Sequence, residues 1–224
     1  MGGVFMKVKI CGISNEIDAL DAVSLGADAI GFVMGGKVLP IEVEPYAQWV
    51  RETIKKFPEG VDSFLVTHLF NSDDILDLSN YIKSTGIQIS EDIDIEEVKK
   101  VRKSTNKKII KTVVTTDPKA PQKLKLYEPY CDYFLLDSRD SGYTGGTGKE
   151  NNWSKCKELI EMTEKPVFIA GGLNPENLRG AIEETAPYGV DVSTGISSYS
   201  ESYLRKDRKD HKKIEKFIKI AKEY

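Results

Sequence analysis

The chain has 224 residues, of which 40% are hydrophobic and 30% are charged. This length and composition are typical of one globular domain with a buried core, and they exclude a disordered or fibrous protein. The net charge of −3 gives no overall attraction to phosphate polymers, and no apolar run has the length of a membrane span, so we expect neither nucleic acid nor a membrane as a partner.

Cysteine usage points to a reducing compartment. Cys11, Cys131 and Cys156 are widely spaced and fit neither a disulfide framework nor a metal site of paired cysteines. We therefore expect a cytoplasmic protein without a bound metal. The first residues lack the features of a signal peptide, and Met6 is a second candidate start, which would leave Met1–Phe5 as an extension.

Short β-branched runs alternate with longer helical patterns along the whole chain. Strands are predicted at Val8–Cys11, Ala29–Val33, Ser63–Leu69, Gly86–Ile89, Lys108–Val114, Tyr133–Leu136, Pro166–Ala170 and Gly189–Val192. Helices are predicted at Glu16–Leu25, Glu44–Lys56, Asp73–Lys83, Ile95–Lys103, Pro121–Tyr127, Trp153–Met162, Pro175–Glu184 and Lys212–Glu223. Eight such units predict an α/β fold, a single (β/α)₈ TIM barrel in which residues 1–224 form one domain. An open doubly wound sheet is the alternative, but its glycine-rich turn would follow the first strand.

The first strand ends in Cys11, and alternation along it places Lys9 and Cys11 on one face. If that face is inward, both side chains reach the mouth of the barrel. The sixth strand delivers Asp137 to the same rim from the opposite side. A thiol and a carboxyl flanking one small space suit proton transfer, whereas a buried structural cysteine and a helix-capping aspartate are the alternative interpretations.

Glycine-rich turns follow the last three predicted strands. In Ala170–Pro175 we expect Asn174 to cap the next helix and Pro175 to begin it, while Ser193–Gly195 suits a short extra helix. Barrels commonly bind phosphate at the turns after strands seven and eight. The segment Gly142–Gly148 fits a loop that closes over a ligand. The predicted phosphate-binding residues are Gly146, Gly148, Gly171, Gly172, Ser193, Thr194 and Gly195.

Two histidines are the remaining titrating candidates. His68 lies within an apolar strand and His211 lies in a basic stretch before the last helix. Neither has an evident partner in the sequence, so we interpret both as structural, although His68 faces the barrel mouth if the third strand has the right register.

Motifs in a fixed order along the chain resemble the phosphoribosylanthranilate isomerase family. They are Lys9-Ile10-Cys11-Gly12, Gly26-Ala27-Asp28-Ala29-Ile30-Gly31-Phe32, Leu136-Asp137-Ser138, Gly145-Gly146-Thr147-Gly148, Ala170-Gly171-Gly172-Leu173, Gly189-Val190-Asp191-Val192-Ser193-Thr194-Gly195, Lys209-Asp210 and Lys212-Lys213-Ile214. The resemblance covers nearly the entire chain.

This resemblance implies an isomerase of tryptophan biosynthesis, an intramolecular oxidoreductase of the aldose–ketose type without a cofactor. Its substrate is a small phosphorylated sugar, an N-(5-phosphoribosyl) amine, which becomes the 1-amino-1-deoxyribulose 5-phosphate by an Amadori rearrangement. Cys11 matches the general base that removes the C2 proton, and Asp137 matches the general acid for the ring oxygen. We expect a cation such as Lys9 to favour the Cys11 thiolate. Monomer and homodimer both stay open.

Departures from the family pattern fall where the aromatic part of the substrate would bind. Val38-Leu39-Pro40 stands in place of a Ser-Pro-Arg whose arginine reads the anthranilate carboxylate, and Gln88-Ile89-Ser90 replaces Gln-Leu-His. The segment Ser198–Arg208 is longer than the family's turn. The candidate substrate-binding residues are Lys9, Lys37, Gln88 and Arg139. Two alternatives follow: a paralogue that isomerises another phosphorylated aminosugar, and a non-catalytic barrel that binds a phosphorylated metabolite.

Overall fold

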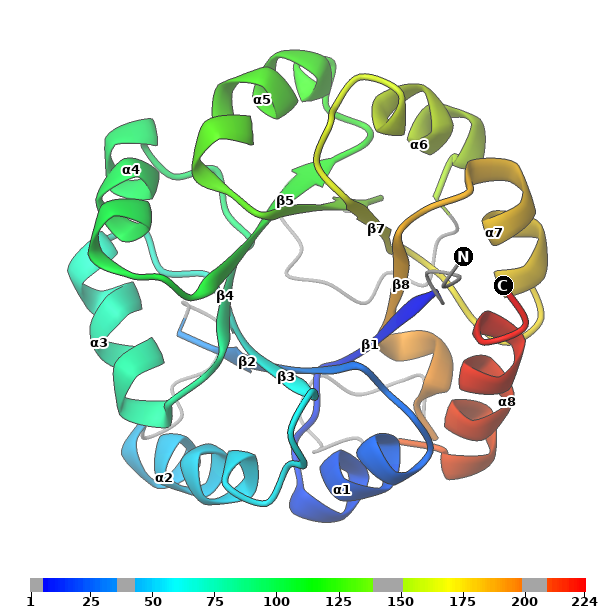
Figure 1. Ribbon diagram of the computed structural model, residues 1–224, viewed down its shortest axis with the longest axis horizontal. Coiled ribbons are helices and arrows are strands. Elements are labelled where there is room, and N and C mark those ends of the chain that lie inside the picture. The colour runs from blue at the N-terminus through cyan, green and yellow to red at the C-terminus, as the bar shows by residue number, and fades with distance from the viewer. Residues whose placement is uncertain (1–5, 36–42, 139–150, 199–208) are drawn as a thin grey trace.

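The computed structural model describes residues 6–35, 43–138, 151–198 and 209–224. Eight parallel strands close into a barrel in sequential order, and the helices surround it (Figure 1). The strands are β1 Lys7–Cys11, β2 Ala29–Met34, β3 Asp62–Thr67, β4 Gly86–Ile89, β5 Lys108–Val114, β6 Tyr133–Asp137, β7 Val167–Ile169 and β8 Gly189–Val192. The helices are α1 Glu16–Ser24, α2 Val43–Ile54, α3 Ser72–Ile82, α4 Ile95–Ser104, α5 Ala120–Tyr127, α6 Trp153–Ile160, α7 Leu178–Thr185 and α8 His211–Ala221, with 3-10 turns η1 Glu128–Tyr130 and η2 Thr194–Ile196. The (β/α)₈ fold expected from the sequence is confirmed.

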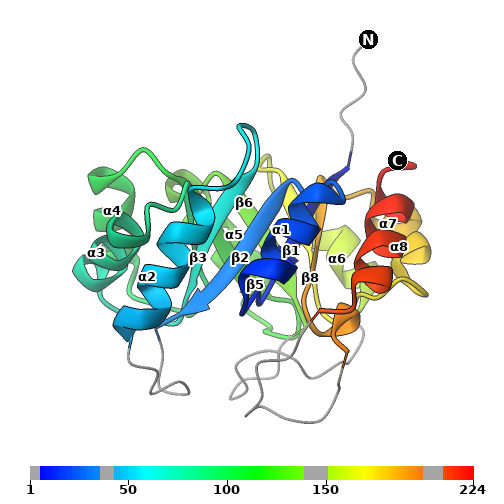
Figure 2. The same cartoon turned by 90° about the horizontal axis from the view of Figure 1, so that it is seen from below.

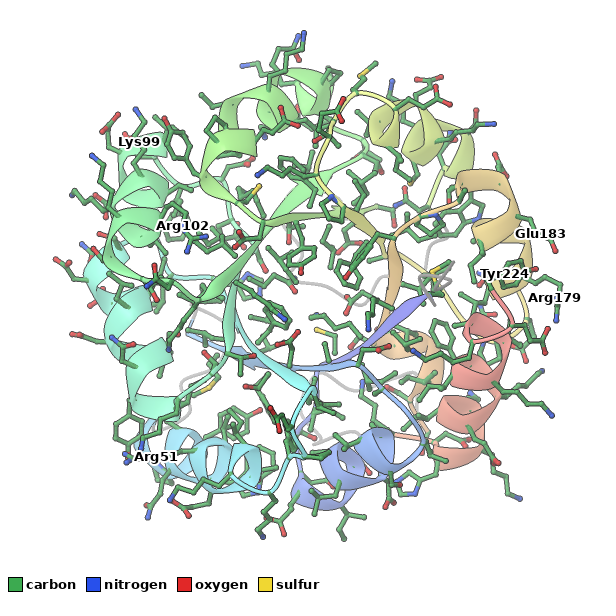
Figure 3. The ribbon with its side chains drawn as sticks, in the orientation of Figure 1. Arg51, Lys99, Arg102, Arg179, Glu183 and Tyr224 are labelled. Atoms are coloured by element: carbon green, nitrogen blue, oxygen red, sulfur yellow. The ribbon has the colours of Figure 1, made fainter. Side chains whose placement is uncertain are left out.

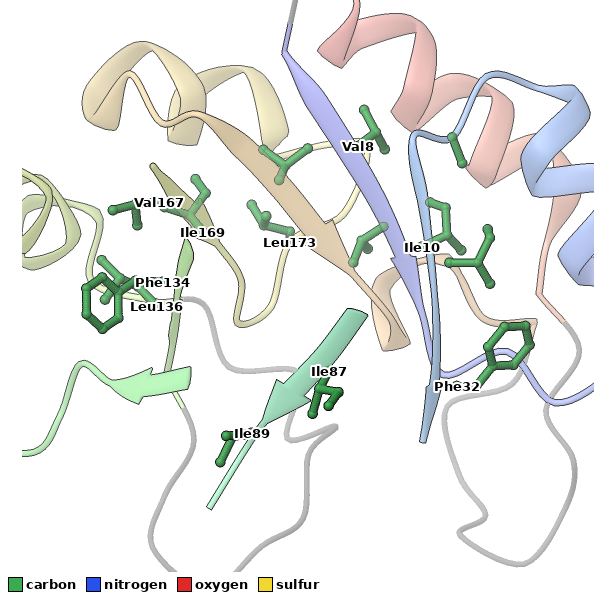
Figure 4. Packing of buried hydrophobic residues seen from close by; sticks show 14 of the residues in the cluster. Val8, Ile10, Phe32, Ile87, Ile89, Phe134, Leu136, Val167, Ile169 and Leu173 are labelled. Carbon is green, nitrogen blue, oxygen red and sulfur yellow. The ribbon is translucent and has the colours of Figure 1, made fainter. Parts of the chain in front are cut away.

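The side chains of the strands divide into two apolar clusters by alternation. The outer cluster lies between strands and helices and includes Val8, Ile10 and Phe134 (Figure 4). The inner cluster fills the barrel and includes Cys11 and Val66. The two faces predicted for the first strand are therefore confirmed.

The amino-terminal end of the barrel is filled by aromatic rings. The ring centroid of Phe168 lies 5.8 Å from that of Tyr133 and 5.4 Å from that of Tyr188. Glycines make room for rings on the neighbouring strands, because an added Cβ on Gly189 would lie 2.5 Å from Phe168 and one on Gly86 would lie 2.2 Å from Phe64. This end of the barrel is therefore a packed core.

An ion-pair network at the same end joins the start of β1 to the end of α8. Asp28, just before β2, accepts from the Nζ of Lys7 at 2.9 Å and from that of Lys222, and also from the Val8 N–H. Lys222 donates as well to the Met6 carbonyl. Figure 2 shows the last turn of α8 at the end of the barrel opposite the carboxyl ends of the strands.

Charged side chains cover the outer helices. The three arginines within the described residues all lie there: Arg51 stacks over Tyr81, Arg102 pairs with Asp132, and Arg179 contacts Glu223 and Tyr224 (Figure 3). Among the described helices, none is long and apolar enough to cross a membrane.

Several predicted boundaries differ from the structure by one to three residues, and at two of them local hydrogen bonds give the reason. Strand β3 ends at Thr67, two residues earlier than expected, because the His68 N–H donates to the Gly35 carbonyl and the Leu69 N–H donates to the Thr67 hydroxyl. Helix α7 begins at Leu178, three residues after Pro175.

The late start of α7 has its cause in the turn before it. The Asn174 side chain accepts from the backbone N–H groups of Glu176 and Asn177, while the Asn177 side chain accepts from the Asn174 N–H. These bonds form a closed turn that contains Pro175. Asn177 occupies the N-cap position predicted for Asn174.

Candidate active site

Cys11 is the last residue of β1, and its side chain points into the barrel. An added Cβ on Gly31 of β2 would lie 2.9 Å from the Cys11 sulfur, 3.0 Å from the Lys9 Nζ and 3.1 Å from Val66. The glycine thus leaves the space that the thiol and the ammonium occupy. The thiol lies on the β1–β3 side of the mouth.

Beneath Cys11, Lys9 forms an ion pair that sequence analysis missed. Its Nζ donates to Asp191 Oδ1 of β8 at 2.7 Å, and the two side chains are 0% and 9% exposed. Burial alone would lower the pKa of Lys9, but the charges of Asp191 and Cys11 outweigh it and hold the pKa above the ordinary lysine value. Asp191 alternates with the outer residues Val190 and Val192, so its inward position could have been predicted from strand periodicity.

Lys9 acts on the Cys11 thiol in the expected direction, since it lowers the pKa, but it does not bring that pKa below the ordinary value. Burial raises the pKa of the Cys11 thiol; Lys9 and Lys209 oppose this, and Asp191 adds to it. The net direction is upward, because burial is the largest of these effects and Asp191 adds to it. Cys11 is therefore mostly a neutral thiol at neutral pH.

Asp137 ends β6 on the opposite side of the barrel from β1. It lies two residues after Leu135 of the inner cluster and therefore on the same face of the strand, so the carboxyl faces inward at the same rim as Cys11. An added Cβ on Gly171 would lie 3.1 Å from Asp137 Oδ1 and 2.5 Å from the Ser138 hydroxyl. The acid predicted from the sequence thus adjoins the turn after β7.

The turns after β7 and β8 pack directly on each other. An added Cβ on Gly195 would lie 1.9 Å from the Leu173 carbonyl oxygen. Gly171 and Gly172 have φ angles of +90° and +69°, which favour glycine. The short helix expected after the last strand is confirmed as η2.

These turns carry backbone amides suited to an anion. The Gly172 carbonyl is occupied by the side-chain amides of Asn174 and Asn177. Within the described segments, the N–H groups of Gly172, Thr194 and Gly195 donate no hydrogen bond. Backbone N–H groups of this kind at adjacent turns are suited to donate to an anion such as phosphate.

A second buried lysine lies beside the turn after β8. Lys209 is 5% exposed, and its Nζ donates to the Ser193 carbonyl at 3.0 Å. Its backbone N–H donates to the fully buried Asp18 carboxylate, which His211 also contacts at 3.0 Å. The other ring nitrogen of His211 lies 2.8 Å from Asp21. His211 is thus structural as expected, but the expectation that it lacks a partner is wrong.

The β3–β4 side of the mouth carries polar groups. His68 follows β3, and its Nδ1 lies 2.6 Å from Glu91 Oε1, so this histidine also has a partner. Gln88 of β4 is 3% exposed and directs its Nε2 to Thr112 Oγ1 at 3.4 Å. Gln88 therefore lies inside the barrel, as expected for a substrate-binding residue.

Several predicted positions lie outside the described residues. They are Met1–Phe5, Lys37, Val38-Leu39-Pro40, Arg139, Gly142–Gly148 and the greater part of Ser198–Arg208.

Known proteins resemble this chain over nearly its whole length. The sequence model described as N-(5'phosphoribosyl)anthranilate (PRA) isomerase matches residues 8–220. N-(5'-phosphoribosyl)anthranilate isomerase 2 of Methanosarcina mazei is 33% identical, over 97% of this chain and 94% of that protein. The isomerase of Methanosarcina acetivorans is 34% identical, over 95% and 91% of the two chains.

Solved structures of phosphoribosyl anthranilate isomerases are similar to this chain in fold. The phosphoribosyl anthranilate isomerase of Thermotoga maritima superposes with a TM-score of 0.81 at 32% identity, over 98% of this chain and all of that chain. A phosphoribosyl anthranilate isomerase in complex with reduced 1-(o-carboxyphenylamino)-1-deoxyribulose 5-phosphate gives 0.77 at 30% identity, again over 98% and 100%.

Proposed function

Because the chain belongs to the N-(5'-phosphoribosyl)anthranilate isomerase family, we propose that it converts phosphoribosylanthranilate to 1-(o-carboxyphenylamino)-1-deoxyribulose 5-phosphate. The observation that supports this most directly is the pair Cys11 and Asp137, which enter one end of the barrel from β1 and β6. A base and an acid on opposite sides of a sugar are what an Amadori rearrangement needs.

In the first step Asp137 acts as the general acid. Its proton goes to the furanose ring oxygen as the bond from that oxygen to C1 breaks, and the nitrogen lone pair forms a C=N bond at C1. The open sugar carries a positive iminium next to the C2–H bond. This positive charge makes the C2 proton acidic.

In the second step Cys11 acts as the general base. The thiolate takes the C2 proton, and the electrons of the C–H bond form a C1=C2 double bond while the C=N electrons return to nitrogen. The resulting enolamine tautomerises to the C2 ketone with a proton added at C1. Since the pKa of Cys11 is raised in the free protein, Lys9 and Lys209 act by partly offsetting that cost.

The phosphate belongs at the turns after β7 and β8. The amides of Gly171, Gly172 and the residues of Ser193–Gly195 supply donors for the phosphate oxygens. This grip fixes the sugar so that C2 faces Cys11 and the ring oxygen faces Asp137. Lys9 and Gln88 would line the sugar, and the same proposal keeps Lys37, Arg139, Gly146 and Gly148 as substrate contacts.

Turnover of phosphoribosylanthranilate by the purified protein tests the proposal. Each of the variants Cys11→Ser and Asp137→Asn should lower kcat by about 10²–10⁴-fold while the fold, followed by circular dichroism, is kept. Lys125→Gln, on the outer helix α5, serves as a control whose kcat should equal that of the parent. Normal turnover by both site variants would refute the catalytic roles.

Complementation of a tryptophan-requiring strain tests the activity in a living cell. The gene should restore growth without tryptophan to a strain that lacks this isomerase, and Cys11→Ser should not. The comparisons do not favour a different aminosugar or a non-catalytic barrel.

A further inference from the structure

The β3–β4 side of the mouth holds a group of polar atoms that the catalytic steps leave unused. Within the described residues, only Gln88 Oε1 and Ser90 Oγ are buried side-chain polar atoms with no hydrogen-bond partner. Gln88 and Ser90 are 3% and 6% exposed. An unpaired polar group buried in a protein is costly, so two of them side by side indicate a place that a polar ligand fills.

Strand register brings His68 next to these atoms. Val66 pairs with Gln88 and Thr67 pairs with Ile89, and the Ser90 N–H continues the ladder to the Thr67 carbonyl. His68 and Ser90 are therefore neighbours at the ends of β3 and β4. Alternation after the inner residue Val66 directs His68 inward.

Glu91 fixes the orientation of the His68 ring. Its Oε1 lies 2.6 Å from Nδ1, and the side chains of His68 and Glu91 are 13% and 29% exposed. In the described part of the chain, the Nε2 of His68 has no partner. A ring held by one nitrogen presents the other to a ligand in a set direction.

His211, the second histidine of the chain, has a partner at both ring nitrogens. Both ring nitrogens of His211 contact carboxylates, Asp18 at 3.0 Å and Asp21 at 2.8 Å. A carboxylate oxygen accepts hydrogen bonds, so it is a fitting partner for an imidazole N–H. His68 has one of these two carboxylates from the protein, so the matching occupant of Nε2 is a carboxylate from a ligand.

The geometry points to His68, oriented by Glu91, as the residue that binds the carboxylate of the arylamine part of the substrate, with Ser90 donating a second hydrogen bond and Gln88 Oε1 accepting from the adjacent amine N–H. This assignment rests on the proposed function, because the arylamine with a neighbouring carboxylate is the part that the reaction leaves unchanged. It fits the positions of the described arginines, all of which lie on outer helices. His68 is a specificity-determining residue and takes no part in proton transfer.

Kinetics with two substrates test the assignment. Phosphoribosylanthranilate is compared with phosphoribosylaniline, which lacks the carboxylate. His68→Asn should reduce the ratio of their kcat/KM values by about tenfold to a hundredfold, the size expected for a lost charge-assisted hydrogen bond. The change should appear in KM for phosphoribosylanthranilate, with kcat within a few fold, because the carboxylate is remote from the breaking bonds. Glu91→Gln should give a smaller reduction of the ratio.

Arg179→Gln is the matched control, since it removes a cation from the outer helix α7 and should leave the ratio unchanged. An unchanged ratio in His68→Asn would overturn the assignment. An equal loss for both substrates would also overturn it, because a hydroxyl contact or a purely structural role predicts that result.

A binding measurement separates this inference from the proposed function. The chain contains two histidines, so ¹⁵N spectra of the imidazoles show two sets of signals. The set that disappears in His68→Asn belongs to His68. Reduced 1-(o-carboxyphenylamino)-1-deoxyribulose 5-phosphate should shift His68 Nε2 and leave His211 in place, and the compound without the carboxylate should not shift His68. Turnover of phosphoribosylanthranilate without a His68 shift would refute the carboxylate site alone. Absence of both turnover and binding would refute the proposed function and this assignment together.

Discussion

The Nζ of Lys9 and the Oδ1 of Asp191 lie 2.7 Å apart inside the barrel, and this buried pair sets the charge beneath Cys11. Asp191 stabilises the ammonium, and by doing so it removes much of the positive field that would otherwise act on the thiol. The pair thus links the stability of the barrel to the protonation of the proposed base.

The first prediction concerns the stability of this pair. Asp191→Asn leaves the Lys9 ammonium in the barrel without its partner and should lower the free energy of unfolding by about 3–5 kcal/mol. Lys9→Met should have a loss of similar size. The double variant Lys9→Met/Asp191→Asn should lose less than the sum of the two single losses, since it leaves no unpaired charge. Urea denaturation measures all three, and strictly additive losses would contradict a coupled pair.

The second prediction concerns the titration of Cys11. Its pKa is raised, so the thiolate fraction, and with it the rate of alkylation by iodoacetamide, should keep rising as the pH passes the ordinary thiol value of about 8.5. Burial raises the pKa of Cys131 and Cys156 to about 12, so their labelling should also require high pH. Mass spectrometry separates the label on Cys11 from the label on the other two thiols, and the Cys11→Ser variant serves as the control. A rate that is already constant at pH 7 would mean that the thiol is ionised there.

The third prediction concerns the space beside the thiol. Gly31→Ala places a methyl group 2.9 Å from the Cys11 sulfur and 3.0 Å from the Lys9 Nζ. The variant should lower stability by about 1–3 kcal/mol and lower kcat by about tenfold or more, because the base is displaced. Gly180→Ala in α7 is the control: its added Cβ meets nothing within 4 Å, and it should stabilise the helix by about 1 kcal/mol with kcat unchanged. Parent-like kcat in Gly31→Ala would argue against a fixed thiol position.

The fourth prediction concerns the phosphate turns. Gly195→Ala would place a carbon 1.9 Å from the Leu173 carbonyl oxygen, so the two turns must separate. KM for phosphoribosylanthranilate should rise at least about tenfold, and inorganic phosphate should become a weaker competitive inhibitor by a similar factor. Thermal unfolding shows whether the variant stays folded. If a folded variant keeps its affinity for inorganic phosphate, the anion binds elsewhere.

Much of the fold could be predicted from the sequence because each βα unit carries its own signal. The strands Gly86–Ile89, Lys108–Val114 and Gly189–Val192 were predicted with the bounds that the structure has. Errors arose where side chains bond to nearby backbone, as at Thr67 and in the asparagine turn before α7. Such bonds end or delay an element without changing its apolar periodicity.

The site could be predicted in its strand-end residues but not in its long-range pairs. Periodicity placed Lys9 and Cys11 on the inner face, yet the partner of Lys9 is 182 residues away on β8. In the same way, Glu91 is the partner of His68 only because β3 and β4 are neighbours. Local patterns tell which way a side chain points, whereas its partner depends on strand order and register.

The network around Asp28 and the ring cluster of Phe168 lie at the end of the barrel away from the thiol and the glycine turns. The Asp28 network that joins the first strand to the last helix is thus separated from the proposed chemistry by the length of the barrel. Substitutions of His68 or Ser90 at the mouth would leave this network untouched. A descendant of this chain could therefore accept a different aromatic substrate and keep the closure between its two ends.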